Sequence, residues 1–169
     1  MISISSNLNV MIKAVEKASK SVIRDFGEVE KLQISKKGPR DFVTKTDKRV
    51  ENIIIEELSK TKKNYSFLSE EIGKIKNKDE ENIWIIDPID GTTNFLHGIP
   101  HFAICIAHKS KDEILSGLIF DPINKIPKFN FQNFNFWSTY LGKVVSINTQ
   151  NNKNEQNIPI LITRFAQTI

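Results

Sequence analysis

The sequence predicts an α+β fold in which helices pack on a mostly antiparallel sheet. Apolar residues recur at three- and four-residue steps across Leu8–Phe26, which is the period of an amphipathic helix. A second stretch with this period covers Thr46–Lys60. Two apolar, β-rich runs, Phe102–Ala107 and Ile114–Phe120, are separated by a short polar segment, as in a β-hairpin. Helices followed by paired strands indicate layered α+β packing.

The first helix has sequence signals at both of its expected ends. Ser5, Ser6 or Asn7 can cap its start, and Gly27 can end it because glycine adopts the left-handed conformation easily. A Lys-Lys-Gly-Pro turn at residues 36–39 is expected to separate the two helices.

Between the second helix and the hairpin, apolar and polar stretches follow one another. Tyr65–Leu68 indicates a short strand, and the apolar run Ile83–Ile86 indicates a buried one. Residues 73–82 are polar and rich in lysine, so we expect a mobile surface loop there.

Length and charge limit the class of protein. The 169 residues correspond to one domain. Residues 1–123 contain 19 Lys and Arg against 19 Asp and Glu, and this neutrality argues against a dedicated nucleic-acid surface. The whole net charge of +4 therefore lies in residues 124–169, where it is spread thinly.

Cysteine usage and hydropathy point to a cytoplasmic protein. Cys105 is the only cysteine, which excludes an intrachain disulfide, and its apolar neighbours favour a small core residue over a reactive thiol. No apolar stretch is long enough to indicate a signal peptide or a membrane span. We therefore expect no membrane partner.

The most informative segment joins a buried run to two acids and a small turn. Asp87 and Asp90 follow Ile83–Ile86, and a Gly-Thr-Thr turn follows them. Carboxylates at the end of a buried strand are unfavourable unless their charge is compensated, and Mg²⁺ prefers such oxygen ligands. A helix that begins at this turn would offer N–H groups to a phosphate. The pattern indicates a phosphoryl-transfer site, and the alternative is a solvated Asp-Pro turn.

The segment Asp87–Phe95 resembles the metal-binding signature of the inositol monophosphatase family. Asp41–Asp47 and Leu68–Glu71 match two upstream motifs of that family in the same order. The resemblance implies a hydrolase, namely a Mg²⁺-dependent, lithium-sensitive phosphatase of phosphate monoesters. It also implies the first half of the family's αβαβα sandwich.

The resemblance implies four metal ligands. They are the carboxylates of Glu70, Asp87 and Asp90 and the backbone carbonyl of Ile89. Glu71 is the neighbouring acid, and we expect it to be a solvated or structural partner.

The resemblance also implies catalytic roles for Asp47, Glu70 and Thr92. The Thr92 hydroxyl and the Glu70 carboxylate would hold the attacking water, and Asp47 would orient Thr92. The substrate phosphate would contact the N–H groups of Gly91 and Thr92, next to Asp90 and Glu70. Local chemistry alone makes Asp47 an N-terminal helix acid that the macrodipole favours, and both roles are compatible.

Other charged residues carry weaker signals. Lys36 or Lys37 lies near the position of a basic residue that faces the site in the family; the alternative is a solvated loop charge. His97, His101 and His108 lack the spacing of a metal site, and His101 is expected to be structural.

Residues 124–169 depart from the family pattern. The family's second half supplies a further metal-binding aspartate and much of the alcohol pocket, but no aspartate follows Asp121 in this sequence. We therefore divide the chain at residue 123 into the N-terminal half of a phosphatase domain and an atypical polar tail, truncated or out of frame.

Three functions stay open at this point. The first is hydrolysis of a small phosphorylated alcohol, with inositol monophosphate as the first expected substrate and a homodimer as the expected assembly. The second is a catalytically impaired remnant of such an enzyme. The third is an interaction protein in an RNA-processing complex, which the neutral charge of residues 1–123 disfavours.

Overall fold

The computed structural model describes residues 6–32, 39–131, 136–140 and 143–147, which form three helices and one sheet. The helices are α1 (Ser6–Leu32), α2 (Pro39–Thr61) and α3 (Thr92–Leu96). The strands are β1 (Tyr65–Ser69), β2 (Gly73–Ile75), β3 (Asp79–Asp90), β4 (Ala103–Ser110), β5 (Glu113–Asp121), β6 (Ile126–Phe131), β7 (Phe136–Tyr140) and β8 (Lys143–Ile147). None of these helices is both long and apolar enough to span a membrane.

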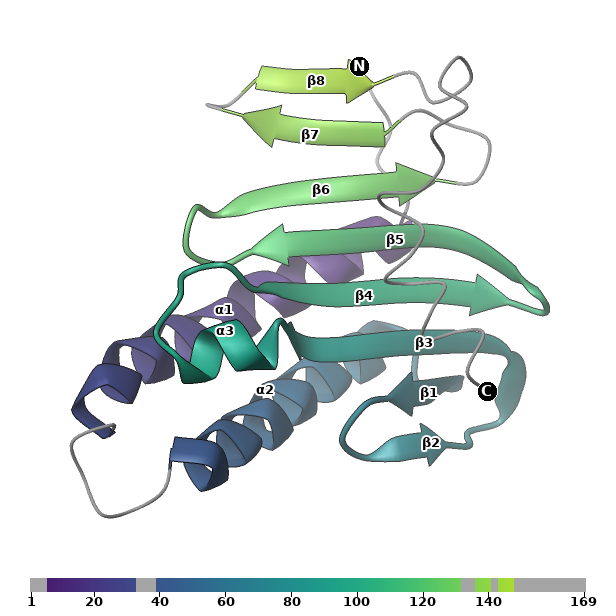
Figure 1. The fold of residues 1–169 in the computed structure, drawn as a ribbon. Helices are drawn as coiled ribbons and strands as arrows, with labels where there is room; N and C mark the ends of the chain where they lie inside the picture. Colours follow the sequence, from purple (N-terminus) through teal and green to yellow (C-terminus); the bar gives the residue numbers. More distant parts are fainter. Residues whose placement is uncertain (1–5, 33–38, 132–135, 141–142, 148–169) are drawn as a thin grey trace.

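The sheet is mixed and almost wholly antiparallel. Its strand order is β2-β1-β3-β4-β5-β6-β7-β8, and among the described strands only β1 and β3 pair in parallel. The long helices α1 and α2 lie side by side on one face of this sheet (Figure 1). This arrangement confirms the predicted layered α+β fold and the predicted β4–β5 hairpin.

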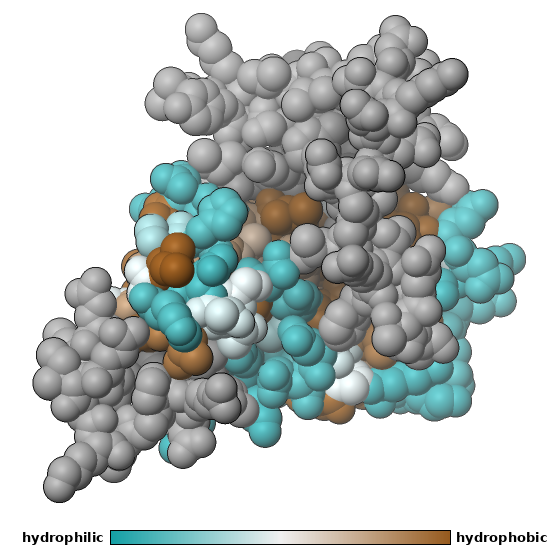
Figure 2. Space-filling model, in the orientation of Figure 1, coloured by the Kyte–Doolittle hydropathy of each residue, from teal (hydrophilic) through white to brown (hydrophobic). Residues whose placement is uncertain are grey.

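The core lies between the two long helices and the sheet. α1 packs against β4 and β5, while α2 packs against β1 and β3. The largest fully buried side chains include Leu8, Met11, Ile54 and Leu58 from the helices and Phe67, Trp84, Ile86, Ile104, Ile106 and Leu118 from the sheet. Each contributes about 1.5–3 kcal/mol, and their sum opposes the unfavourable charge burial described below. On the opposite face of the sheet, hydrophobic and hydrophilic residues lie side by side (Figure 2).

Both long helices extend beyond their predicted bounds. α1 continues through Gly27 to Leu32, so the predicted stop at Gly27 is wrong. The apolar face persists to Val29, which is buried, and this packing outweighs the cost of about 1 kcal/mol for a helical glycine. α2 begins at Pro39 rather than Thr46, because proline fits the first helical position, where no N–H partner is needed. The rest of the predicted turn, residues 36–38, lies outside the described residues.

The predicted loop at residues 73–82 is wrong. Gly73–Ile75 forms the edge strand β2, and β3 already begins at Asp79. The Asn77 amide donates to the Tyr65 carbonyl (2.7 Å), so polar side chains tie this segment to β1. An edge strand needs only one apolar face and tolerates lysines, which is why its composition resembles that of a loop.

β6, β7 and β8 extend the sheet past the predicted boundary at residue 123. β6 pairs with β5 along six residues, from Ile126 opposite Asp121 to Phe131 opposite Ser116. The remaining part of the predicted tail, residues 148–169, lies outside the described residues.

A polar cluster joins α1 to the start of α2. The buried Asp25 carboxylate accepts a hydrogen bond from the Thr46 hydroxyl (3.0 Å) and pairs with Arg49 and with Arg24 (3.0 Å). Arg49 also donates to the Ser21 hydroxyl (3.0 Å). The cluster therefore fixes the turn of α2 that carries Thr46 and the residue after it, Asp47.

A second set of contacts fixes the turn between β3 and α3. Gly91 adopts a φ of 93°, in the left-handed region, and a Cβ there would lie 3.1 Å from the His101 carbonyl oxygen. The Asn94 amide donates to that same carbonyl (2.7 Å). Phe95 packs edge-on against Phe102 at 5.1 Å between ring centroids. The chain after Asp90 is thus held in one path.

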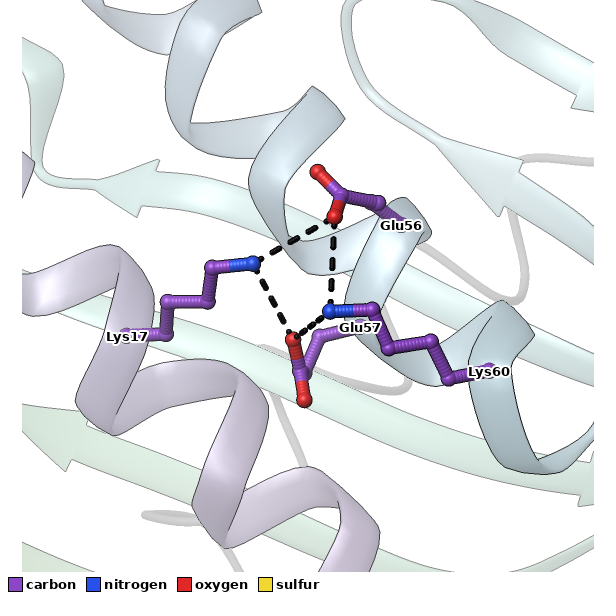
Figure 3. Close-up of polar contacts among 4 residues, drawn as sticks. All are labelled: Lys17, Glu56, Glu57 and Lys60. Atoms are coloured by element: carbon purple, nitrogen blue, oxygen red, sulfur yellow. Dashed lines mark hydrogen bonds and ion pairs between the residues drawn. The ribbon is translucent and has the colours of Figure 1, made fainter.

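We expect Asp25→Ala to lower the free energy of unfolding by about 2 kcal/mol, because it removes hydrogen bonds to a buried carboxylate. Urea denaturation measures the change. Glu56→Ala is the control: Glu56 belongs to the exposed ion-pair group Lys17–Glu56–Glu57–Lys60 (Figure 3) and should cause no measurable change. Equal effects of both substitutions would contradict this assignment.

Gly91→Ala should destabilise the fold by about 1–3 kcal/mol, because the new Cβ meets the His101 backbone and the positive φ strains any L side chain. Gly27→Ala is the matched control, since a Cβ at this helical glycine meets nothing within 4 Å and should stabilise the protein slightly. Thermal melting of both variants checks the opposite signs.

Candidate functional site

The parallel pairing of β1 and β3 brings two acidic segments to the same end of the sheet, where both strands terminate. Ser69 ends β1 opposite Ile86, and the Glu70 N–H donates to the Ile86 carbonyl (3.3 Å). Because parallel strands point the same way, the residues after β1 lie beside the last residues of β3. Glu70 therefore stands next to Asp87.

A β-bulge sets the direction of the two aspartates at the end of β3. Asp87 pairs with Cys105 and Asp90 with Ala103, so β3 has one residue more than β4 in this interval. In a regular strand, residues three apart point to opposite faces of the sheet. The extra residue of the bulge turns the second of them back to the face of the first. Ile86 and Ile89 both lie in the hydrophobic core, which shows the shift directly. Asp87 and Asp90 thus point to the same side.

α2 contributes a third acidic segment. Asp47 is 5% exposed and lies in the first half of α2, which packs against β1, β3 and α3. Its carboxylate is close enough to those of Glu70, Glu71 and Glu51 for their negative charges to raise its pKa. The structure thus brings together Asp47, Glu70, Asp87 and Asp90 from stretches far apart in the sequence.

Burial raises the pKa of every acid in this group, and neighbouring carboxylates add to the shift at Asp47, Glu70 and Asp87. Burial, then the charges of Glu70 and Asp90, raise the pKa of Asp87 to about 8. Burial and the neighbouring acids raise the pKa of Asp47 to about 7. Burial also raises the pKa of Glu70 and of Asp90, although His101 opposes the shift at Asp90. At neutral pH Asp87 therefore keeps its proton, and full ionisation of the group requires a positive charge that its surroundings do not supply.

Several oxygens in this group have no hydrogen-bond partner. Buried oxygens of Asp47, Glu51, Asp87 and Ser69 are unpartnered, and none of the described ion pairs involves these three acids. Buried polar atoms without partners are rare and call for an explanation such as a bound ion.

The same carboxylates do not form a finished cage. Within residues 6–29 and 45–125, no three acidic, histidine or cysteine side chains are gathered closely enough to hold a metal ion as they stand. Instead, burial and then the charge of Glu70 raise the pKa of Asp87 to about 8, so the pair of carboxyl groups keeps a proton at neutral pH. A divalent cation would neutralise the same charge that this proton neutralises, so the donor set fits an oxygen-liganded ion.

Thr92 follows the bulge at the start of α3. Its hydroxyl donates to the Ile89 carbonyl (2.9 Å), so the predicted partners Thr92 and Asp47 are not joined by this bond. The hydroxyl has one proton, and this bond uses it, which leaves its oxygen able to accept a hydrogen bond from a bound water. Gly91 allows the close backbone approach that this turn requires.

The remaining candidates lie at the margin of the site or away from it. His97 and His101 are exposed, while His108 is buried and bonded to Asn7 and Asn82 (3.0 Å each). The free Cys105 is buried as predicted, and burial followed by the charges of Asp87 and Asp90 raises the pKa of its thiol. Lys36 and Lys37 lie outside the described residues.

Sequence reasoning missed Glu51. Its side chain is fully buried, one helical turn after Asp47, and it accepts a hydrogen bond from the Glu71 N–H (3.2 Å). The available signal was the spacing of four residues between Asp47 and Glu51, which places both on one face of the helix.

Comparison with curated proteins gives relatives that are longer than this chain. The inositol-1-monophosphatase of Rhizobium meliloti is 55% identical over 118 residues, which are 70% of this chain and 44% of that protein. The protein named Nus factor SuhB of Vibrio cholerae is 40% identical over 116 residues, which are 69% of this chain and 43% of that protein. The chain thus spans less than half the length of these relatives.

Solved structures share the fold. The extragenic suppressor protein suhB of Bartonella henselae superposes with a TM-score of 0.70 at 45% identity, over 79% of this chain and 52% of that chain. The inositol monophosphatase of Anabaena superposes with a TM-score of 0.63 at 27% identity, over 78% of this chain and 46% of that chain.

The sequence model of the inositol monophosphatase family matches residues 4–165, which is nearly the whole chain. The match includes the acidic strand ends, the bulge and the Gly-Thr turn described above. By this match and by its curated relatives, the chain belongs to the inositol monophosphatase family.

Proposed function

We propose that this chain carries the ion- and phosphate-binding part of a Mg²⁺-dependent phosphatase that hydrolyses phosphate monoesters. One observation supports this most: Asp47, Glu70, Asp87 and Asp90 meet at one end of the sheet with uncompensated charge. Such a group is unfavourable in an empty site and favourable around divalent cations. The family membership agrees with this chemistry.

Four groups are proposed to hold the ion. They are the carboxylates of Glu70, Asp87 and Asp90 and the carbonyl of Ile89, all at the edge where β1 and β3 end. When bound, the ion supplies charge neutralisation for the phosphate and a lower pKa for a water ligand.

The chain's own residues position the reactants. Glu70 is exposed enough to reach solvent, and with the Thr92 hydroxyl it is proposed to hold the attacking water. The Asp47 carboxylate on α2 lies close enough to Glu70 for their charges to interact, and it is proposed to favour transfer of the water's proton to the Glu70 carboxylate. The N–H groups of Gly91 and Thr92, next to Asp90, are proposed to contact the phosphate. This positioning is most of what phosphoryl transfer requires.

The substrate class is proposed from the relatives. Proteins named inositol-1-monophosphatase are 49–55% identical to this chain over the matched region, so inositol monophosphate is the first substrate to test. Relatives named Nus factor SuhB, at 35–40% identity, support a second candidate, a binding role without turnover. A catalytically impaired chain with an intact ion site is the intermediate case.

Turnover of inositol 1-phosphate with Mg²⁺ tests the proposal. We expect phosphate release by the wild type, and a loss of roughly 100-fold or more in Asp90→Asn, because a carboxylate proposed to hold the charge-neutralising ion is removed. Asp112→Asn, in the exposed β4–β5 turn, is the matched control and should keep full activity. A wild type that binds Mg²⁺ without turnover would point to the impaired form; equal rates in both variants would contradict the site.

Stability should depend on pH in a direction set by the raised pKa values. Between about pH 4 and pH 8 the folded protein keeps protons on Asp47 and Asp87 that the unfolded chain has lost, so stability should fall as pH rises. Mg²⁺ favours the ionised acids, so it should raise the melting temperature more at about pH 8 than at about pH 5.

Circular dichroism melts with and without millimolar Mg²⁺ provide the measurement. Asp87→Asn should weaken both the pH dependence and the response to Mg²⁺. An ion-free protein whose stability rises steadily from about pH 5 to about pH 8 would contradict the assignment.

A further inference from the structure

The side chain of Glu51 is fully buried on α2 and has not been assigned a role so far. One carboxylate oxygen, Oε1, accepts a hydrogen bond from the backbone N–H of Glu71 (3.2 Å). The other, Oε2, is buried without a partner. Among the described residues, no lysine or arginine forms an ion pair with Glu51.

We infer that Glu51 is a positioning residue that holds the Glu70–Glu71 turn in place and thereby sets the position of the Glu70 carboxylate. The importance of Glu70 rests on the function proposed above. The bond from Glu51 to the turn does not, because it is a contact within the fold.

Two hydrogen bonds anchor consecutive residues of this turn to different elements. The Glu70 N–H donates to Ile86 on β3, and the Glu71 N–H donates to Glu51 on α2. The bond from Glu70 to Ile86 continues the parallel pairing with β3. By itself it would still allow the Glu70–Glu71 turn to rotate about this one contact. The second bond, to the helix, removes this freedom, so both anchors together define where the Glu70 side chain begins.

The cost of burying Glu51 indicates a role beyond stability. Its neighbours on the inward side of α2, Val50, Ile54 and Leu58, are fully buried and apolar. A buried carboxylate without a cation is strongly unfavourable, and an apolar side chain would stabilise the helix–sheet contact more. Unlike an apolar residue, the acid can accept a hydrogen bond from the backbone N–H of Glu71, in the turn after β1.

Two conservative variants separate the acceptor from the charge. Glu51→Gln keeps the length of the side chain and a carbonyl acceptor but removes the charge. Glu51→Asp keeps the charge but withdraws the acceptor from Glu71 by one methylene. Glu57→Asp, on the same helix and paired with Lys17 and Lys60 on its outer side, is the matched control.

Three readouts apply to each variant. Hydrogen exchange of the Glu71 amide reports the bond, the carboxyl ¹³C chemical shift of Glu70 reports the position of that group, and calorimetric titration with MgCl₂ reports ion affinity. In Glu51→Asp we expect exchange about tenfold faster, a changed Glu70 shift and Mg²⁺ affinity about tenfold weaker, as for other lost supporting contacts. Glu51→Gln and Glu57→Asp should stay within about threefold of the wild type.

The outcomes distinguish this inference from the proposed function. Slow Glu71 exchange in Glu51→Asp, or equal losses in the Gln and Asp variants, would overturn the positioning role. A wild type without Mg²⁺ affinity would overturn the proposed function, while amide exchange and the Glu70 shift would still decide the role of Glu51. If Glu51→Asp does not fold, unchanged readouts in Glu51→Gln support the acceptor role and altered ones overturn it.

Discussion

The crowding of carboxylates where β1 and β3 end is the constraint to which the rest of the structure responds. Asp47 and Asp87 have pKa values raised to about 7 and about 8, and Glu70 and Asp90 shift in the same direction. In the absence of a counter-ion such a group favours unfolding at neutral pH. The apolar layer between the long helices and the sheet supplies the opposing free energy.

Three local devices turn this crowding into a defined arrangement. The parallel β1–β3 pair places Glu70 beside Asp87, the bulge at residues 88–89 turns Asp90 to the same side, and Glu51 holds the turn after β1 from behind. Each device acts on the backbone rather than on the charged groups themselves. The acids can therefore stay unpaired, which an ion-binding group must be, while their positions are fixed.

Much of this arrangement could be predicted from the sequence because it depends on local patterns. Periodicity predicted α1 and α2, two apolar, β-rich runs predicted the β4–β5 hairpin, and the motif at residues 87–95 predicted the family. The errors have tertiary causes. Packing of Val29 carried α1 past Gly27, and pairing with β1 made a strand of the polar residues 73–75. Glu51 was missed because its partner is the backbone N–H of Glu71. Every residue except proline has such a group, so no side-chain pattern in the sequence marks it.

The ion-binding role and the catalytic role can be separated in this chain. Every carboxylate proposed to hold the ion lies between residues 70 and 90, in the turn after β1 and at the end of β3. The proposed ion affinity therefore depends on a compact set of contacts and not on the further aspartate that the family's second half is expected to supply. Turnover also requires orientation of the alcohol, and effective molarities of about 10⁵ M or more depend on it. The proposal therefore allows a chain that binds a divalent ion and still differs from its longer relatives in rate, so affinity and rate have to be measured independently.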